Sequence, residues 1–390
     1  MTFLDLIRNE MRAVFSNATI LLTVFGGVVI YSFLYPLPYA EQIPRDQQVV
    51  VVNLDGSRLS RRLERMVDAT PQVRIERRAF SIQEARDLFI RERLAGILVI
   101  PEHFHRDLLL GKTPTLSYAG DASYFLVFST VLEGLAGAGN TLAAEVKVKR
   151  MVMSGQALPL AVEQSSAMKL SLRSVFNTTS GYVNYVVPAI FVVILHQTLV
   201  MGVGILCGIE NEARRRGESV YRQAAGPLKL FAVRTGLFTV IYWLLCMYYF
   251  GFSFQFYAIP RNAHFGELNL VILPFLLGAA SFGICLGLLL PRRELVTLIV
   301  LLSSMPLVFG AGFIWPVESI PEPISAIIQY IPMVPAIRMF LALNQMGGDF
   351  KALLPVWGQM WVCVALYGVL AWMLLHLEKR RYRRTSLRVD

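Results

Sequence analysis

The sequence predicts an α-helical polytopic membrane protein with six transmembrane helices and an α/β extracytoplasmic domain inserted between the first two. Of the 390 residues, 55% are hydrophobic and only 16% are charged, and the mean hydropathy is +0.52. These values exclude an ordinary soluble enzyme. Several hydrophobic segments also reach the length of about 20 residues that a helix needs to span a bilayer.

The first candidate span, residues 18–39, follows an amphipathic stretch. Within residues 1–17, Leu4, Ile7, Met11 and Val14 recur at helical spacing, with charged residues between them. This pattern favours a helix in the cytoplasmic interface that leads into a retained anchor, and a cleaved signal peptide is the alternative. The five further spans are predicted within residues 182–377, at 182–208, 230–259, 268–290, 295–314 and 353–377.

Basic residues gather in alternate connections between these spans. They precede the first span, lie between the second and third and between the fourth and fifth, and fill the tail, residues 378–390. The positive-inside rule then predicts that both termini are cytoplasmic and that residues 40–181 are periplasmic or extracellular. Juxtamembrane basic residues also contact anionic membrane lipid, so a nucleic-acid role for the tail is not needed to explain them.

Residues 40–181 have the composition of a globular domain in which strand and helix signals alternate. Ser57 and Ser81 are candidate helix N-caps, and Pro101 is placed to begin a third helix. A polar helical stretch at 163–176 is expected to return the chain to the membrane. The strands are predicted at 47–53, 72–76, 94–100 and 113–118, and a long helix at 122–153.

A proline-rich block at 310–350 interrupts the hydrophobic pattern. It is too broken for one spanning helix and too apolar for an aqueous loop. Non-helical backbone at membrane depth needs protein or a wet cavity to satisfy its polar groups. We therefore expect a re-entrant segment at 315–350 that folds back at the outer surface and gates a path. The candidate gate residues are Gly310, Trp315, Pro316, Pro321, Pro332 and Pro335.

The connection at 209–229 is the second informative segment. It has an acidic start, a basic run, a central Gly-Glu pair and a terminal Gly-Pro, which make it more structured than a plain connector. Charges that serve topology alone are the alternative interpretation. The residues that carry the pattern are Glu210, Arg214, Arg215, Gly217, Glu218, Gly226 and Pro227.

These segments together resemble the ABC-2 type transporter permeases. The block at 310–350 matches the family's Gly, Trp-Pro, acidic, Pro and second Pro-x-x-Pro order. The run from Gly96 through Pro101 and Phe104 to Gly111, followed by Asp121-Ala-Ser123, resembles the external domain of large-loop members. The connection at 209–229 matches the pattern Glu … Arg-x-x-Gly … Pro, although Ala225 stands where many members have Thr.

The resemblance implies the transmembrane subunit of an exporter in the bacterial inner membrane. It implies a dimer with a second, identical or related, permease chain and two separate ABC ATPase subunits that carry ATP and Mg. The connection at 209–229 would then dock a short helix on the ATPase. A periplasmic adaptor and an outer-membrane channel often accompany such exporters. A hydrophobic or amphipathic substrate is expected, with Phe252, Phe254 and Phe256 either lining its path or anchoring the interface.

The chain lacks the motif GxxxxGK[ST], so we expect no P-loop ATP site and no cofactor in this polypeptide. Neither a catalytic constellation nor cysteine or histidine spacing typical of a metal site is present. An ion-coupled transporter is the rival hypothesis and needs paired ionisable residues inside the spans. His196 is the mid-span candidate, and we interpret it as a hydrogen-bonded packing residue. A non-transporting membrane assembly or sensor protein is the third hypothesis.

Overall fold

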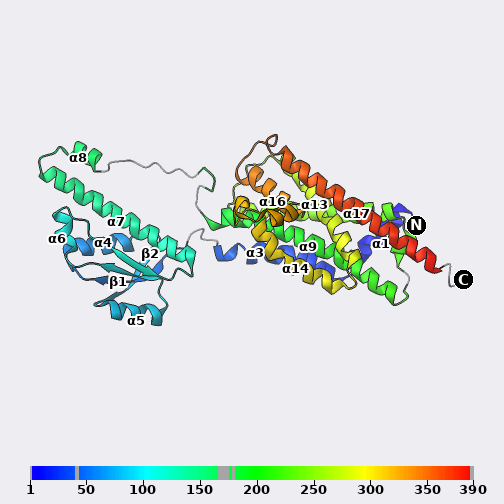
Figure 1. Ribbon diagram of the computed structural model, residues 1–390, viewed down its shortest axis with the longest axis horizontal. Coiled ribbons are helices and arrows are strands. Elements are labelled where there is room, and N and C mark those ends of the chain that lie inside the picture. The colour runs from blue at the N-terminus through cyan, green and yellow to red at the C-terminus, as the bar shows by residue number, and fades with distance from the viewer. Residues whose placement is uncertain (1, 40–43, 166–174, 178–180, 219, 387–390) are drawn as a thin grey trace. The chain divides into compact units, whose positions relative to one another are not determined.

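The computed structural model describes residues 2–39, 44–165, 175–177, 181–218 and 220–386 (Figure 1). Contacts divide the chain into two compact units, each described here by itself. One unit contains Met1–Ala40 and Val175–Asp390, and the other contains Glu41–Ser174. The expected polar helix at 163–176 lies mostly outside the described residues.

Seven helices of the described chain are long and apolar enough to span a membrane. Six of them belong to the first unit, and the seventh, α7, covers the sheet of the second unit. The seven are Ala18–Tyr39, Phe125–Met153, Tyr182–Arg215, Pro227–Phe256, Phe265–Leu289, Arg293–Gly310 and Leu354–Arg381. The sequence-based prediction counted six spans and placed residues 122–153 in the α/β domain, whereas length and composition alone give seven candidates among the described residues.

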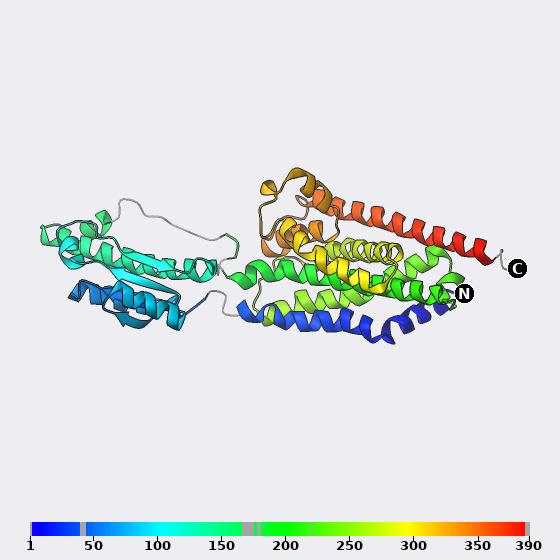
Figure 2. The same cartoon turned by 60° about the horizontal axis from the view of Figure 1, so that its bottom comes forward.

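The helical unit is built around α9, Tyr182–Arg215 (Figures 1 and 2). Its sequence is apolar on every side, which is the pattern of a fully surrounded helix, and 94% of its most apolar window is buried. Its helical neighbours include α3 (Gly27–Leu34), α11 (Pro227–Met247), α13 (Phe265–Leu289) and α14 (Arg293–Gly310). α1 (Phe3–Phe15) packs on α11, and α17 (Leu354–Ser386) packs on α13. Both α9 and α17 extend beyond their expected ends, so the starts of the predicted connection and of the predicted tail are helical.

The N-terminal helix α1 is amphipathic, as predicted. Thr2 and Asp5 form a capping box at its start. The side chains of Leu6, Glu10 and Val14 are buried one turn apart and face the bundle, whereas Leu4 is 77% exposed. The sequence pattern had placed Glu10 among the residues of the polar face, and the structure places it inside.

Glycines allow α9 and α13 to approach each other closely. An ideal Cβ on Gly287 of α13 would lie 2.9 Å from the Cα of Gly204 and 2.6 Å from the Cβ of Cys207. An ideal Cβ on Gly283 would lie 3.0 Å from the carbonyl oxygen of Val200. The GxxxG pattern of α13 is therefore used for backbone contact with α9, the arrangement that small residues permit in membranes.

The proline-rich block forms two helical pieces, Glu322–Ile328 and Met333–Gln345, bent by 89°. At 1.5 Å per residue they are about 10 and 20 Å long, too short to cross a hydrocarbon layer of about 30 Å. The second piece begins as α16, Met333–Phe340, and is almost entirely buried against α9, α13 and α17. The expected break of the helix in this block is present.

Among the residues that the structure describes in the helical unit, three stretches have π-helical turns. They are Leu22–Gly26 in the first span, Tyr248–Ser253 after α11, and Leu341–Gln345 after α16. Each stretch joins directly onto α-helix at one or both of its ends. Such turns fit one additional residue into an otherwise regular helix.

The second unit is a three-layer α/β domain around a four-stranded sheet of order β2-β1-β3-β4. β1 pairs in parallel with β2 and β3, and β4 is antiparallel to β3. The valines of β1 alternate between two cores, one under α4, α6 and α7 and the other under α5. The elements are β1 Gln47–Asn53, α4 Arg58–Asp68, β2 Val73–Ala79, α5 Ile82–Glu92, β3 Gly96–Ile100, α6 Phe104–Leu109, β4 Ser117–Gly120, α7 Phe125–Met153 and α8 Leu158–Gln164.

The close approach of α9 and α13 predicts opposite effects for two Gly→Ala substitutions. Gly287→Ala should lower the thermal stability of the purified protein, because its methyl group overlaps the backbone of α9, at a cost of about 1–3 kcal/mol. Gly236→Ala in α11 meets open space and should be neutral or slightly stabilising. Melting followed by size-exclusion chromatography in detergent measures both. Equal melting temperatures would contradict the packing described.

Candidate functional site

A buried arginine, Arg234, binds Glu210, one of the residues predicted in the connection at 209–229. Its side chain on α11 is 1% exposed. Arg234 Nη2 lies 2.6 Å from Glu10 Oε1 and 2.6 Å from Glu210 Oε1. Its Nε donates to Glu10 Oε2 at 3.1 Å, and its Nη1 donates to Glu210 Oε2 at 3.0 Å. One guanidinium thus joins α1 and α9 to α11.

The ionic contacts continue from Glu210 to α10, Tyr221–Ala224, and to α17. Arg222 donates to Glu210 Oε2 at 3.2 Å through Nη1 and to Glu378 Oε1 at 2.8 Å through Nη2. Glu378 also pairs with Arg214. We call these six residues the ion-pair cluster: Glu10, Glu210, Arg214, Arg222, Arg234 and Glu378. Three acidic and three basic groups give it no net charge.

Polar neighbours complete the cluster. Tyr221 donates to Glu10 Oε1 at 3.0 Å and accepts from Arg234 Nη2 at 3.1 Å. Burial raises the pKa of Tyr221 above its ordinary value, so the phenol remains a donor. Asn211 accepts from Arg222 at 2.8 Å and donates to the carbonyl of Gly287 at 2.8 Å, which connects the cluster to the end of α13.

Burying a charge costs several kcal/mol unless it is paired and hydrogen-bonded. Arg214 contacts one carboxylate, and Arg222 and Arg234 each contact two. The cluster can therefore exist in an apolar bundle only while its helices stay together. Movement of one helix would remove a partner from a buried charge and destabilise the arrangement.

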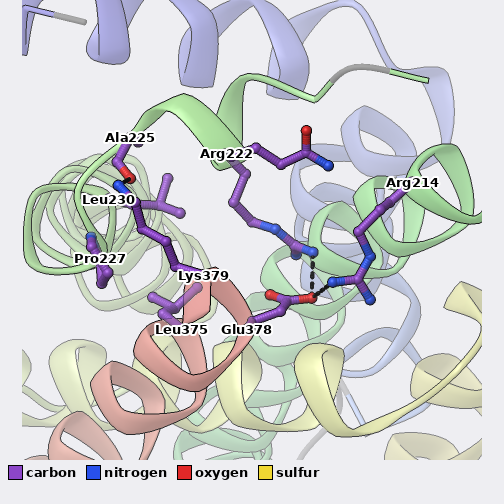
Figure 3. Close-up of a pocket in the computed structure, with 9 residues that line it drawn as sticks. Arg214, Arg222, Ala225, Pro227, Leu230, Leu375, Glu378 and Lys379 are labelled. Atoms are coloured by element: carbon purple, nitrogen blue, oxygen red, sulfur yellow. Dashed lines mark hydrogen bonds and ion pairs between the residues drawn. The ribbon is translucent and has the colours of Figure 1, made fainter. Parts of the chain in front are cut away.

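A small pocket lies beside the cluster. Its walls come from the end of α9, α10, the start of α11 and the end of α17, and its volume is about 30 Å³. Glu378 reaches between Arg222 and Arg214, and Lys379 Nζ donates to the carbonyl of Ala225 at 2.6 Å (Figure 3). A pocket of that volume can hold water but is too small for a substrate. The residues of this region therefore serve contact between helices.

The other residues predicted in the connection lie at the surface. Gly217 ends α9 with φ +80°, and the amide of Glu218 donates to the carbonyl of Ala213, as in a Schellman motif. Glu218 pairs with Arg216 at 2.7 Å, and both side chains are exposed. Arg215 is also exposed. Gly226 and Pro227 are the N-cap and first residue of α11. Glu210 points inward, and Arg214 is shared between the surface and the cluster.

The predicted gate residues gather at the other end of α9. Tyr185 donates to the carbonyl of Phe313, and Gly310 packs directly against Ile328. Trp315, Pro316 and Pro321 are exposed around the start of the bent helix pair, whereas Pro332 and Pro335 are buried. Tyr185 and Glu210 are 25 positions apart, about 37 Å along the helix, so gate and cluster lie at opposite ends.

The three phenylalanines predicted on a path do not share one face. Phe252 and Phe256 are exposed and their ring centroids are 6.2 Å apart, but Phe254 is fully buried against Phe191 and Phe250. His196 is buried between Phe275 and Phe282. Neither of its ring nitrogens has a hydrogen-bond partner among the described residues, so the expected hydrogen bond is not found there.

Sequence reasoning missed that Glu210 shares Arg234 with Glu10 and Arg222 with Glu378. It also missed Tyr221, which bonds to Glu10 and Arg234. The available signal was Arg234 itself, a charged residue inside the apolar segment 230–259, which requires a partner. The sequence does not tell which acidic residue supplies it, since Glu10 lies 224 positions away.

Removal of Arg234 should expose the dependence of the bundle on this cluster. Arg234→Met leaves Glu10 and Glu210 buried without their shared cation and should lower the free energy of unfolding by about 3–5 kcal/mol. Adding Glu10→Gln should restore part of that loss, because Glu210 keeps Arg222. Unfolding by SDS in detergent measures the free energy of unfolding of each single variant and of the double variant. The exposed pair of Arg216 and Glu218 serves as the control and should show no measurable coupling. If the losses in free energy of unfolding of the Arg234 and Glu10 variants simply add in the double variant, the two residues are not coupled and the cluster is contradicted.

Comparison with known proteins agrees with this architecture. The chain matches a family model described as ABC-2 family transporter protein over residues 18–373, which include the α/β unit and the spans after it. None of the curated proteins compared with the sequence matches it. Proteins of the matched family are membrane-spanning permeases that generally work with a separate ABC ATPase. This chain therefore belongs to the ABC-2 family of transporters and is a multi-pass membrane permease.

Proposed function

We propose that this permease is the transmembrane subunit of an ABC exporter that moves a hydrophobic or amphipathic substrate outward. Family membership supports the permease role. The proposed mechanism rests on the ion-pair cluster, which joins the connection at 209–229 to the surrounding helices. The energy comes from ATP hydrolysed with Mg on a separate ATPase. Two permease chains, identical or related, form one path, with both termini in the cytoplasm of a bacterial cell. A periplasmic adaptor and outer-membrane channel are further partners in this proposal.

The docking surface in this proposal is Arg215, Gly217 and Glu218. These residues are exposed at the end of α9, while Glu210, on the same helix, is buried in the cluster. A push on the connection moves Arg222 on α10, which contacts both Glu210 and Glu378. The displacement thereby reaches α9 and α17 together. Glu210 transmits the force within the bundle, and its side chain does not contact the ATPase.

The substrate leaves at the opposite end of α9 in this proposal. The bent helix pair lies there, and its buried part packs on α9, α13 and α17. Movement of α9 or α17 therefore changes the support of the pair. Phe252 and Phe256, which are exposed and stacked, remain as candidate lining of the path, and Phe254 is a packing residue.

The docking assignment predicts a loss of coupling without a loss of folding. The double variant Arg215→Ala/Glu218→Ala should reduce co-purification of a Walker-motif ATPase with the tagged chain about tenfold or more, because both side chains of the contact are lost. Its melting temperature should stay unchanged, since both side chains are exposed. The matched control is Glu322→Ala/Lys351→Ala, which removes one acidic and one basic exposed residue elsewhere. Equal ATPase recovery from both variants would refute docking at the connection.

The source of energy separates this proposal from an ion-coupled transporter. Export of lipophilic dyes from cells that express the chain with its ATPase should stop with vanadate and continue with an uncoupler. Each charge of the ion-pair cluster is paired and the six formal charges sum to zero, which suits force transmission better than proton uptake. Export by the purified chain alone, in vesicles driven by an ion gradient, would overturn the proposal.

A further inference from the structure

The α/β unit contains an apolar cavity that the transport proposal does not use. Its volume is about 360 Å³, within the range of about 300–1,000 Å³ typical of ligand pockets. Well-packed cores contain few voids larger than a water molecule. The cavity lies between α4, α6, α7 and the edge of the sheet at β3 and β4, and its lining includes Leu63, Leu98, Phe104, Leu116, Leu132 and Leu142.

Small residues on α7 keep this space open. Ala136, Gly139 and Ala143 lie at positions i, i+3 and i+7 of the helix and all line the cavity. An ideal Cβ on Gly139 would lie 3.4 Å from Cδ1 of Leu116, which is the opposite wall. Leucines at the same three positions would project into the cavity. The sequence of α7 thus leaves unfilled a space that its neighbours surround.

The side chains that line the cavity disfavour a charged ligand. The cavity has no Asp, Glu, Lys, Arg or His among its lining residues. Tyr118 donates its hydroxyl to the carbonyl of Ala95 at 3.3 Å, and burial raises the pKa of Tyr118 to about 12, so it stays neutral. A buried ligand charge would have no partner here.

The cavity opens along α7, where its lining residues Leu132, Ala136 and Ala143 are exposed, and two polar residues lie at the same opening. Ser117 and Asn140 are both exposed lining residues. Asn140 also lines a neighbouring open groove between α7 and α8, which carries Thr141, Glu145 and Lys149. A ligand with an apolar chain and a polar end can therefore place the chain inside and the polar end beside Asn140.

We propose that this cavity binds a neutral alkyl chain whose polar end lies at Asn140. The chain comes either from a membrane lipid or from a soluble amphipathic molecule, and both have the same chemistry. The site goes beyond the permease role described above, and its occupancy can be measured without ATP or transport. A negative result here therefore leaves the proposed function untouched.

Photolabelling of the full chain in nanodiscs tests the proposal. One arm uses a neutral alkanol with a diazirine on its chain, and the other uses phosphatidylcholine with the same diazirine on an acyl chain. Mass spectrometry should find label in peptides from α7 and β4. Gly139→Leu should reduce this label about tenfold or more, because the leucine occupies the space of the ligand. Gly137→Leu is the control, since the same substitution two residues away meets open space.

The arms separate the two sources of the chain. Labelling by the alkanol assigns a soluble ligand, and labelling by the phospholipid assigns the membrane. Ala143→Leu is a second filling variant and keeps the test informative where Gly139→Leu fails to fold, as judged by its melting temperature. Absence of label in α7 and β4 in both arms would overturn the proposal. Label that persists unchanged in the correctly folded filling variants would do the same.

Discussion

The cost of a charge in an apolar environment organises the helical unit. Arg234 is almost completely enclosed, and an unpaired guanidinium there would destabilise the bundle by several kcal/mol. Its two carboxylates come from α1 and α9, and the contacts reach α17 through Glu210, Arg222 and Glu378. The position of the N-terminal helix, the end of α9 and the end of the last span are therefore set by the same electrostatic requirement.

Local patterns in the sequence were sufficient for most of the elements. β1 was expected at 47–53 and forms there because four valines in succession suit a strand buried on both faces. Ser57 and Ser81 cap α4 and α5 as expected. The ends of α9 and α17 were less predictable, because charged residues such as Glu212 and Arg380 favour helix as readily as they favour an aqueous connection.

The candidate site could be predicted only in part. The exposed residues Arg215, Gly217 and Glu218 follow a linear pattern, so the sequence identifies the surface of the connection. The burial of Glu210 depends on contacts with Glu10, Arg222 and Arg234, and periodicity holds no information on which distant residues meet. The same limit applies to Phe254: Phe252 and Phe256 on either side of it are exposed, while its own ring packs against Phe191.

The π-helical turns have a consequence for how the spans tolerate changes in length. Each turn contains one residue more than regular helix requires. Deleting a residue from Leu22–Gly26 would convert that turn to ordinary helix and leave the following face of the span in phase. The same deletion within the regular α13 would rotate everything beyond it by about 100° and turn its glycines away from α9. The first span can therefore lose one residue without a change in the direction of its side chains, whereas α13 cannot.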